Sequence, residues 1–210
     1  VKASRYIIYS PKREYKITAK PRRQTDCVSI SAVQKTFTIS PCHYDCHNND
    51  VADLGYQQFL SRTLTPLIAR IKPGAIGLDF GCGEGAVLSQ MAVAQGIKVV
   101  NYDLFYHPDT LALSQKYDFV CLTEVIEHIA NAQALMAQLS TLLLPGGILA
   151  VMTKHIPSLD KFNNWYYKID PTHINFYSIE TFQWVALQQG WQLEIIDSDV
   201  VFFHIPTSPA

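Results

Sequence analysis

The sequence predicts an α/β domain in which a mostly parallel sheet carries helices on both faces. From residue 75 onward, short apolar runs of strand length alternate with helical patterns, and this alternation is typical of a parallel sheet covered by helices. A glycine-rich turn joins the first of these strands to a helix. The last two strand-like runs flank an Asp-Ser-Asp turn, which predicts an antiparallel hairpin at one edge.

A basic appendage, residues 1–43, is expected to precede the domain at 44–210. Residues 1–40 carry nine Lys or Arg and only two acids, a balance of +7, which leaves −8 for the rest of a chain of net charge −1. The appendage is either a binding element for nucleic acid or another acidic partner, or a solvated tail. Its short alternating stretches are compatible with a few strands or with no stable structure.

The domain is expected to begin with a helix over residues 50–72, where apolar residues recur at helical spacing. Asp50 or Asp53 can cap this helix, Pro66 is expected to kink or divide it, and Pro73-Gly74 to end it.

Strands and helices then alternate to the C-terminus. The predicted strands cover residues 75–80, 97–103, 117–123 and 146–153, with a closing pair within 191–205, and the predicted helices cover 85–96, 124–143 in two pieces, and 178–190. Only residues 104–116 separate the second strand from the third, too few for a helix, a strand and a second helix. The sheet is therefore expected to be one edge strand short.

Composition narrows the class of protein further. No apolar run approaches the ~18 residues that a membrane span needs, and no signal peptide is visible. The five cysteines are odd in number, and two of them fall in predicted core strands or turns. These features predict a cytoplasmic protein with reduced thiols.

The glycine-rich turn, LDFGCGEG at residues 78–85, is the strongest functional signal. Gly81 and Gly83 allow a tight turn and close approach to a ligand, and Gly85 is expected to open a helix whose N-terminus favours anionic groups. The spacing D-x-G-x-G-x-G differs from the dinucleotide fingerprint G-x-G-x-x-G. Asp79 could orient the turn or meet a cationic amino group, and Asp103, at the end of the next strand, could accept hydrogen bonds from two ribose hydroxyls. The pattern favours a nucleoside that carries an amino acid.

With these motifs, the sequence resembles class I S-adenosylmethionine-dependent methyltransferases over residues 44–204. The turn resembles their first motif, NYD their ribose-binding acid, and YDFVCLTEVIEH and LLPGGILAVMT two of their later strand motifs. The resemblance is closest to a group of small bacterial methyltransferases that share YDxHxNN and DPTHxxFYS, here YDCHNN at 44–49 and DPTHINFYS at 170–178.

This resemblance implies a Rossmann-like three-layer fold, S-adenosylmethionine as cofactor, and a role for nine residues in holding it. The implied cofactor residues are Asp79 at the turn, Gly81, Gly83 and Gly85 along the methionine part, Asp103 at the ribose, Leu104 near the adenine, Thr123 beside the acceptor pocket, and Tyr44 and His47 closing over the cofactor.

A metal site is a second expectation. Glu124, Glu127 and His128 have the spacing i, i+3, i+4, so on one helix they would share a face and suit Mg²⁺, Mn²⁺ or Zn²⁺. The string E-x-x-E-H resembles the metal motif of small-RNA 2′-O-methyltransferases and ubiquinone-pathway O-methyltransferases, which implies His173, or else His155, as a further ligand. Alternatively, these side chains cap the helix or hydrogen-bond across the cleft without a metal.

Residues 154–177 are rich in aromatic side chains and follow the end of a strand, so they are expected to roof the cleft. The rings of Trp165, Tyr166 and Tyr167 could stack on an aromatic acceptor or simply pack. Asp170 and His173 are candidate general bases, beside Glu124 as a third catalytic candidate. His173 could equally be a metal ligand or a structural link.

The sequence thus predicts methyl transfer from S-adenosylmethionine to an acceptor, with a small-molecule hydroxyl favoured and a divalent cation as a possible second cofactor. An RNA 2′-O-methyltransferase and a non-catalytic interaction module are the alternatives.

Overall fold

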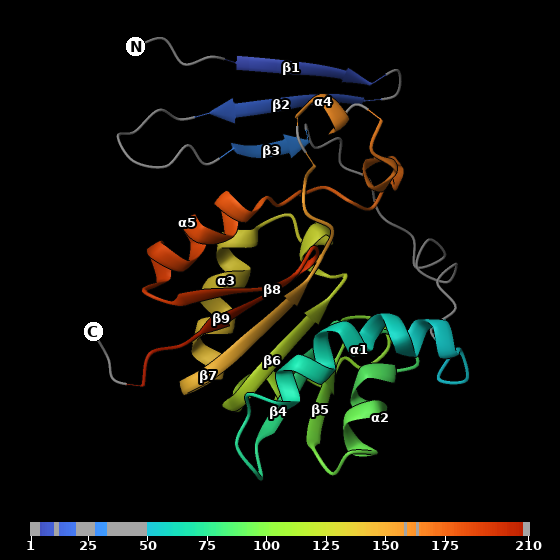
Figure 1. The fold of residues 1–210 in the computed structure, drawn as a ribbon, viewed down its shortest axis with the longest axis vertical. Coiled ribbons are helices and arrows are strands. Elements are labelled where there is room, and N and C mark those ends of the chain that lie inside the picture. The colour runs from blue at the N-terminus through green and yellow to red at the C-terminus, as the bar shows by residue number, and fades with distance from the viewer. Residues whose placement is uncertain are drawn as a thin grey trace.

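The computed structural model describes residues 5–10, 13–19, 28–32, 50–157, 159–162 and 164–207. Its largest feature is a six-stranded sheet in the order β5-β4-β6-β7-β9-β8 (Figure 1). The first four strands of that order are parallel, and β9 runs antiparallel to both β7 and β8. The strands are β4 (Ile76–Phe80), β5 (Lys98–Tyr102), β6 (Tyr117–Thr123), β7 (Leu143–Met152), β8 (Gln192–Asp197) and β9 (Val200–His204). The mostly parallel sheet and its C-terminal hairpin are confirmed.

The sheet ends at β5, as expected for a fold that is one edge strand short. Between β5 and β6 the chain forms only the 3-10 helix η2 (Thr110–Ser114), which begins at the cap residue Asp109. Because that connection contains no strand, nothing in the described part of the chain extends the sheet beyond β5.

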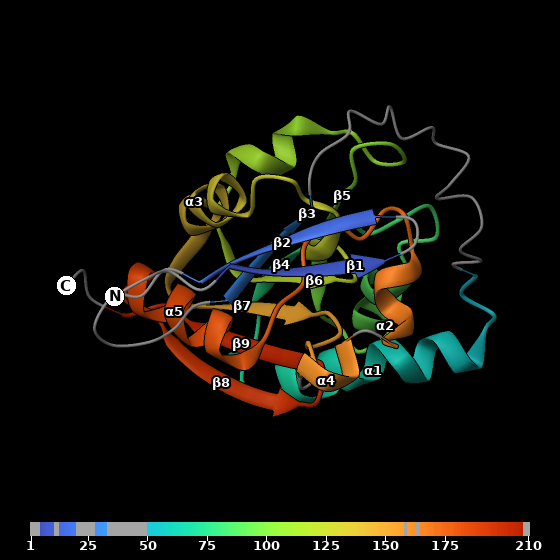
Figure 2. The same ribbon diagram turned by 90° about the horizontal axis from the view of Figure 1, so that it is seen from above.

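Helices cover both faces of this sheet (Figure 2). The helices are α1 (Leu54–Ile68), α2 (Val87–Val93), α3 (Ala132–Leu142), the short α4 (Leu159–Phe162) and α5 (Ile179–Gln189). Along β6, Phe119 and Cys121 pack with α1 and α2, whereas Val120 and Leu122 pack with α3 and α5. Side chains of a strand point alternately to opposite faces, so one buried strand contributes to two cores, and the three-layer arrangement is confirmed.

The boundaries of helices α1 and α2 differ from the sequence expectations. Asp53 caps α1 by accepting from Gly55 N and Tyr56 N, but Pro66 does not divide the helix, which ends at Ile68. Proline removes one backbone donor, and so close to the C-terminus the loss of one hydrogen bond does not interrupt the helix. Helix α2 begins only at Val87, after Ala86 with φ 43°, so Gly85 belongs to the turn.

Residues 124–143 form two pieces as predicted, but the first is only the 3-10 helix η3 (Ile126–His128). Strand β7 starts three residues earlier than expected, at Leu143. Helix α5 follows its prediction closely, because Ser178 and Thr181 form a reciprocal capping box and Gly190 ends the helix with φ 68°.

The N-terminal segment contributes three strands, β1 (Arg5–Ser10), β2 (Arg13–Ala19) and β3 (Val28–Ala32). They form a separate antiparallel sheet in the order β1-β2-β3 (Figure 1). The sequence left open whether the short alternating stretches form a few strands or no stable structure, and the structure shows strands. The expected boundary between residues 43 and 44 lies outside the described residues.

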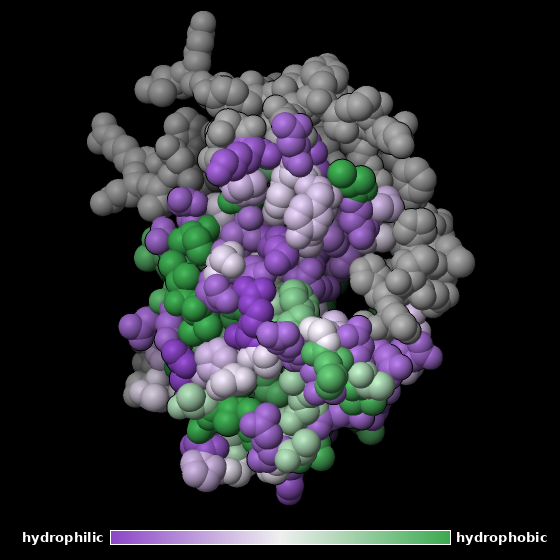
Figure 3. All heavy atoms as spheres, turned by 45° about the vertical axis from the view of Figure 1, so that its right-hand side comes forward, coloured by the Kyte–Doolittle hydropathy of each residue, from purple (hydrophilic) through white to green (hydrophobic). Residues whose placement is uncertain are grey.

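Within the described ranges, no helix is both long enough and apolar enough to cross a membrane. Hydrophilic residues gather across the middle of the face shown in Figure 3, and hydrophobic residues form smaller patches toward its lower part. Cys82 and Cys121 are free and buried. The other three cysteines lie outside the described residues.

Gly77 is the position in the sheet with the least room for a side chain. A Cβ atom there would lie 2.0 Å from Cε2 of Phe119, whose ring is fully buried in the core. Gly77→Ala is therefore expected to lower the free energy of unfolding by about 1–3 kcal/mol, measured by urea denaturation. Gly55→Ala, in the exposed first turn of α1, is the matched control: its Cβ would lie 3.2 Å from Oδ1 of the exposed Asp53, which can shift slightly, so its effect on stability should be much smaller. Equal stability of the two variants would contradict this account of the core.

Candidate active site

A cavity of about 430 Å³ lies where β4, β6 and β7 end. Ligands of open α/β sheets bind at this edge, beyond the carboxyl ends of the strands. Its walls come from α1, from the ends of the strands and the residues that follow them, from the start of α2, and from the segment after β7. The lining residues are Tyr56, Phe59, Leu60, Asp79, Gly81, Cys82, Leu88, Thr123, Glu124, His128, Lys154, Tyr166, Tyr167, Asp170 and His173.

The glycine turn is held in place by strand β5. Gly81 has φ 79° and Gly83 has φ 67°, a region that favours glycine. A Cβ atom at Gly81 would lie 2.5 Å from Cγ2 of Val125. The backbone N–H of Gly81 donates to the Tyr102 carbonyl at 2.7 Å. The turn is thus a preformed wall of the cavity that only glycine can supply at residue 81.

Asp79 lies at the base of the cavity and is almost completely buried. Burial, and then the charge of Asp103, raise its pKa to about 7, although the backbone N–H of Ser89 donates to it. Its Oδ1 atom has no hydrogen-bond partner among the described residues. A buried acceptor without a donor is costly, so Asp79 is well suited to receive a cationic amino group from a ligand.

The raised pKa of Asp79 gives the folded protein a pH dependence. A carboxyl group whose pKa is higher in the folded state stabilises the fold at low pH, and this contribution is lost as pH rises from about 4 to about 7. In ligand-free protein, the stability of the wild type relative to Asp79→Asn is expected to fall by as much as about 4 kcal/mol between pH 4 and pH 8. Urea denaturation at both pH values measures it. An unchanged difference would show that Asp79 titrates normally.

Asp103 braces the turn from the end of β5. Its Oδ2 atom accepts from Gly83 N at 3.1 Å, and its Oδ1 atom accepts from Phe105 N at 2.8 Å and Tyr106 N at 3.1 Å. Asp103, Gly83 and Gly85 are not among the residues that line the cavity. The Leu104 side chain is largely exposed. The predicted cofactor residues therefore divide into a set in the cavity (Asp79, Gly81 and Thr123) and a set beside the turn.

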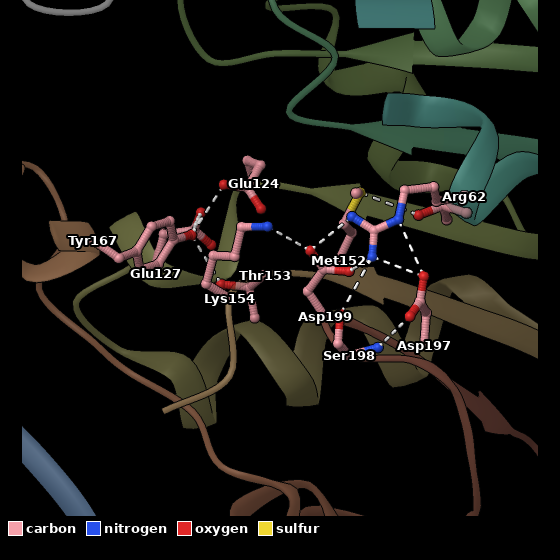
Figure 4. Close-up of polar contacts among 11 residues, drawn as sticks. Arg62, Glu124, Glu127, Met152, Thr153, Lys154, Tyr167, Asp197, Ser198 and Asp199 are labelled. Carbon is pink, nitrogen blue, oxygen red and sulfur yellow. Dashed lines mark hydrogen bonds and ion pairs between the residues drawn. The ribbon is translucent and has the colours of Figure 1, made fainter. Parts of the chain in front are cut away.

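Glu124 and Glu127 form a buried acid pair bridged by Tyr167 (Figure 4). The Tyr167 hydroxyl lies 2.5 Å from Oε1 of Glu127, 3.1 Å from Oε2 of Glu124 and 3.1 Å from Oγ1 of Thr153. Burial raises the pKa of both carboxyl groups, and for Glu124 the charge of Glu127 raises it further. The remaining oxygens, Oε1 of Glu124 and Oε2 of Glu127, have no hydrogen-bond partner among the described residues. A cation would compensate this concentration of negative charge.

Potential ligand atoms of Glu127, His128 and His173 lie within 4.8 Å of one another. Nδ1 of His128 lies 3.1 Å from the Thr172 carbonyl, and Nδ1 of His173 lies 2.7 Å from the Tyr167 carbonyl. A carbonyl only accepts, so each Nδ1 carries a proton, and in the neutral imidazole the lone pair is then on Nε2. Metal-binding histidines are held in this way by backbone carbonyls.

The expectation that Glu124 shares a helical face with Glu127 and His128 is wrong. Glu124 has a left-handed backbone, with φ 54°, and it precedes η3 instead of belonging to it. Glu124 is consequently not in the group with Glu127, His128 and His173. His155 is not in the group either, because its ring packs edge-on against Phe182 at 5.4 Å between centroids.

The segment after β7 borders the cavity as predicted. Its three candidate aromatic residues do not all line the cavity, however. Tyr166 and Tyr167 line the cavity, whereas Trp165 packs against Phe162, Tyr167 and Phe176. Burial tends to raise the pKa of Asp170, but hydrogen bonds from Thr172 and the nearby imidazoles lower it overall. Asp170 is therefore a weak candidate for a general base.

Several cavity residues were not anticipated from the sequence, among them Tyr56, Phe59 and Lys154. Tyr56 and Phe59 come from α1, and burial followed by the charges of Asp79 and Glu124 raises the pKa of Tyr56 to about 12. Lys154 donates to Asp199 at 2.7 Å (Figure 4), and its ammonium group lies over the Phe59 ring. The i, i+3 spacing of Tyr56 and Phe59, and the place of Lys154 just after a strand, were the available signals. Tyr44 and His47 lie outside the described residues.

Comparison with known proteins agrees with this fold. A curated relative, the ubiquinone biosynthesis O-methyltransferase of Mesorhizobium japonicum, is 27% identical over 110 residues, which cover 42% of this chain and 44% of that protein. The matched region thus spans less than half the length of that relative.

Two solved structures from Burkholderia thailandensis share the fold at low sequence identity. An O-methyltransferase family protein matches with a TM-score of 0.53 at 14% identity, over 73% of this chain and 57% of its own. A 1,6-didemethyltoxoflavin-N1-methyltransferase, solved with 1,6-didemethyltoxoflavin and S-adenosylhomocysteine bound, matches with a TM-score of 0.53 at 13% identity, over 95% of this chain and 99% of its own.

A family match covers most of the fold described above. Residues 53–195, well over half of the chain, match the family described as a methyltransferase domain. The match includes the glycine turn, the acid pair and most of the cavity wall. The chain belongs to the methyltransferase domain family.

Proposed function

We propose that this protein transfers the methyl group of S-adenosylmethionine to a hydroxyl group of a small molecule, with the help of a bound divalent cation. The observation that carries the proposal is the joining of two elements in one cavity. The glycine turn, with a buried, unpartnered acid at its base, lines the same cavity as His128 and His173, and the potential ligand atoms of these imidazoles lie near the fully buried carboxylate of Glu127.

The residues around the turn fit the cofactor. Asp79 offers a buried acceptor for the amino group of the methionine part, and Gly81 permits the backbone to approach that part closely. Asp103 would hold the ribose through one hydroxyl instead of two, because a carboxylate has about four lone-pair directions and three backbone donors already occupy three of them. When bound, the cofactor supplies an electrophilic methyl group. The protein must then orient the acceptor oxygen in line with it.

A divalent cation would be held by Glu127, His128 and His173. Two imidazoles and one carboxylate suit Mn²⁺ or Zn²⁺ better than Mg²⁺, which prefers oxygen ligands. When bound, such a cation lowers the pKa of a hydroxyl group and orients it.

Glu124 is the residue best suited to accept the proton of the acceptor hydroxyl. It lines the cavity, and its Oε1 atom has no hydrogen-bond partner among the described residues. His173 would be engaged as a ligand, and the pKa of Asp170 is lowered. General-base catalysis needs a group whose proton affinity is sufficient at the working pH, a condition that burial favours for Glu124.

A basic N-terminal segment favours one second candidate, methylation of a ribose hydroxyl in RNA. The balance of +7 in residues 1–40 would attract a phosphate backbone, and binding to RNA would then weaken steeply as salt increases. Binding of RNA that is insensitive to salt, or no binding, would favour the small-molecule acceptor.

The proposal is tested by methyl transfer from radiolabelled S-adenosylmethionine to matched pairs of aromatic acceptors, one member with hydroxyl groups and the other with amino groups. Transfer to the hydroxyl member only, lost after treatment with EDTA and restored by Mn²⁺, is the expected result. Transfer to the amino member, or transfer unaffected by EDTA, would contradict the proposed acceptor or the proposed cation.

A further inference from the structure

We infer that Tyr167 is a positioning residue that orients the cation ligands from the segment after β7, an inference that rests on the cation site proposed above. Tyr167 contacts two of the three candidate ligands through two different groups. Its hydroxyl donates to Glu127 Oε1 at 2.5 Å, and its backbone carbonyl accepts from His173 Nδ1 at 2.7 Å.

The hydroxyl contact fixes the carboxylate. Glu127 is fully buried, and the Tyr167 hydroxyl occupies one of its oxygens while the other has no hydrogen-bond partner among the described residues. Without the hydroxyl, the carboxylate would lose a compensating donor and would be held less firmly, because only its backbone contact and Thr153 would remain. The geometry offered to a cation would then be poorer.

Tyr167 is itself held rigidly. It lies in the 3-10 helix η4 (Tyr166–Ile169), and its ring is 4.0 Å from the His173 ring and 5.2 Å from the Trp165 ring between centroids. Thr153, at the end of β7, contacts its hydroxyl at 3.1 Å. Because these contacts fix Tyr167, Tyr167 can in turn fix the positions of Glu127 and His173.

His128, the third candidate ligand, is also oriented by a backbone carbonyl. His128 Nδ1 donates to the Thr172 carbonyl at 3.1 Å, so both imidazoles are oriented by carbonyls of residues 167–172. Partners of this kind orient metal ligands, and their loss typically costs 10–100-fold in metal affinity. Tyr167 orients Glu127 through its side-chain hydroxyl, a group that a substitution can remove.

Tyr167→Phe tests the inference because it deletes the hydroxyl and keeps the ring and the carbonyl. The matched control is Tyr117→Phe, since Tyr117 is also buried and its hydroxyl donates to a backbone carbonyl, that of Ala112 at 2.7 Å, away from the cation ligands. Calorimetric titration with Mn²⁺ should give 10–100-fold weaker binding for Tyr167→Phe and binding within about twofold of wild type for Tyr117→Phe. The visible absorption spectrum with Co²⁺ should change only in Tyr167→Phe.

Mn²⁺ affinity and a Co²⁺ spectrum in Tyr167→Phe equal to those of the wild type would overturn the positioning role while leaving the cation site intact. Equal weakening in both variants would also overturn it, because it would indicate a general effect of losing a buried hydroxyl. If the wild type binds neither Mn²⁺ nor Co²⁺, the cation site itself is rejected, and the role of Tyr167 with it. Mn²⁺ affinity and the Co²⁺ spectrum are measured without methyl transfer, so these results do not depend on which acceptor the protein methylates.

Discussion

Glu127→Gln is expected to abolish binding of Mn²⁺, with an affinity at least about 100-fold lower than that of the wild type. Glu127 is the only carboxylate in the group that it forms with the two histidines. Glutamine has nearly the same shape but carries no charge, so it is a much poorer ligand for a divalent cation. Calorimetric titration with Mn²⁺ in protein freed of metal measures the loss.

The same substitution should not destabilise the fold. Burial raises the pKa of Glu127, so its contribution to stability in the absence of a cation decreases as pH rises. A glutamine in its place removes that dependence and can still accept from the Tyr167 hydroxyl. At pH 8 and without metal, the variant is therefore expected to be at least as stable as the wild type in urea.

Glu180→Gln, in the exposed first turn of α5, is the control for removing a carboxylate and should bind Mn²⁺ normally. Undiminished Mn²⁺ binding by Glu127→Gln would refute the cation site. A variant that loses binding and stability together would leave only a structural role for Glu127.

Asp103→Ala is expected to reduce the affinity for S-adenosylhomocysteine by more than about 100-fold while the protein remains folded. The substitution removes the proposed ribose ligand and also the acceptor for three backbone donors, among them Gly83 N in the glycine turn. Asp103→Asn keeps one acceptor oxygen and is expected to lose affinity to a smaller extent. Charge-assisted hydrogen bonds are about twice as strong as neutral ones.

Asp109→Ala provides the matched control. Asp109 is an exposed aspartate in the same connection, and it accepts from Leu111 N at the start of η2. Loss of such a cap costs about 1 kcal/mol of stability without involving the turn, so cofactor affinity should be unchanged. An Asp103→Ala protein that binds S-adenosylhomocysteine like the wild type would remove the ribose assignment.

Elements that rest on local sequence signals could be predicted. Strand β6 has the predicted bounds, and helix α5 lies within the predicted range 178–190, between its caps Ser178 and Gly190. The short connection between β5 and β6 correctly indicated the missing edge strand, because its length excludes a further helix and strand. These features depend on periodicity, on capping and on chain length, all of which can be read from a single sequence.

The arrangement of the acid pair could not be predicted, because it depends on contacts between distant segments. The left-handed backbone of Glu124 breaks the helical face that the spacing suggested, and Tyr167 joins Glu124 and Glu127 from about 40 positions further along the chain. No local pattern distinguishes Tyr167 from Trp165 or Tyr166 in the same aromatic run. The choice among them is made by packing against Thr153 and His173.

The most direct test of the central claim is calorimetric titration of the wild-type protein with S-adenosylhomocysteine. The account predicts saturable binding in the micromolar range with one site per chain, carried by the glycine turn and the acids beside it. No binding, with or without Mn²⁺, would contradict the proposed methyl transfer, whatever the acceptor.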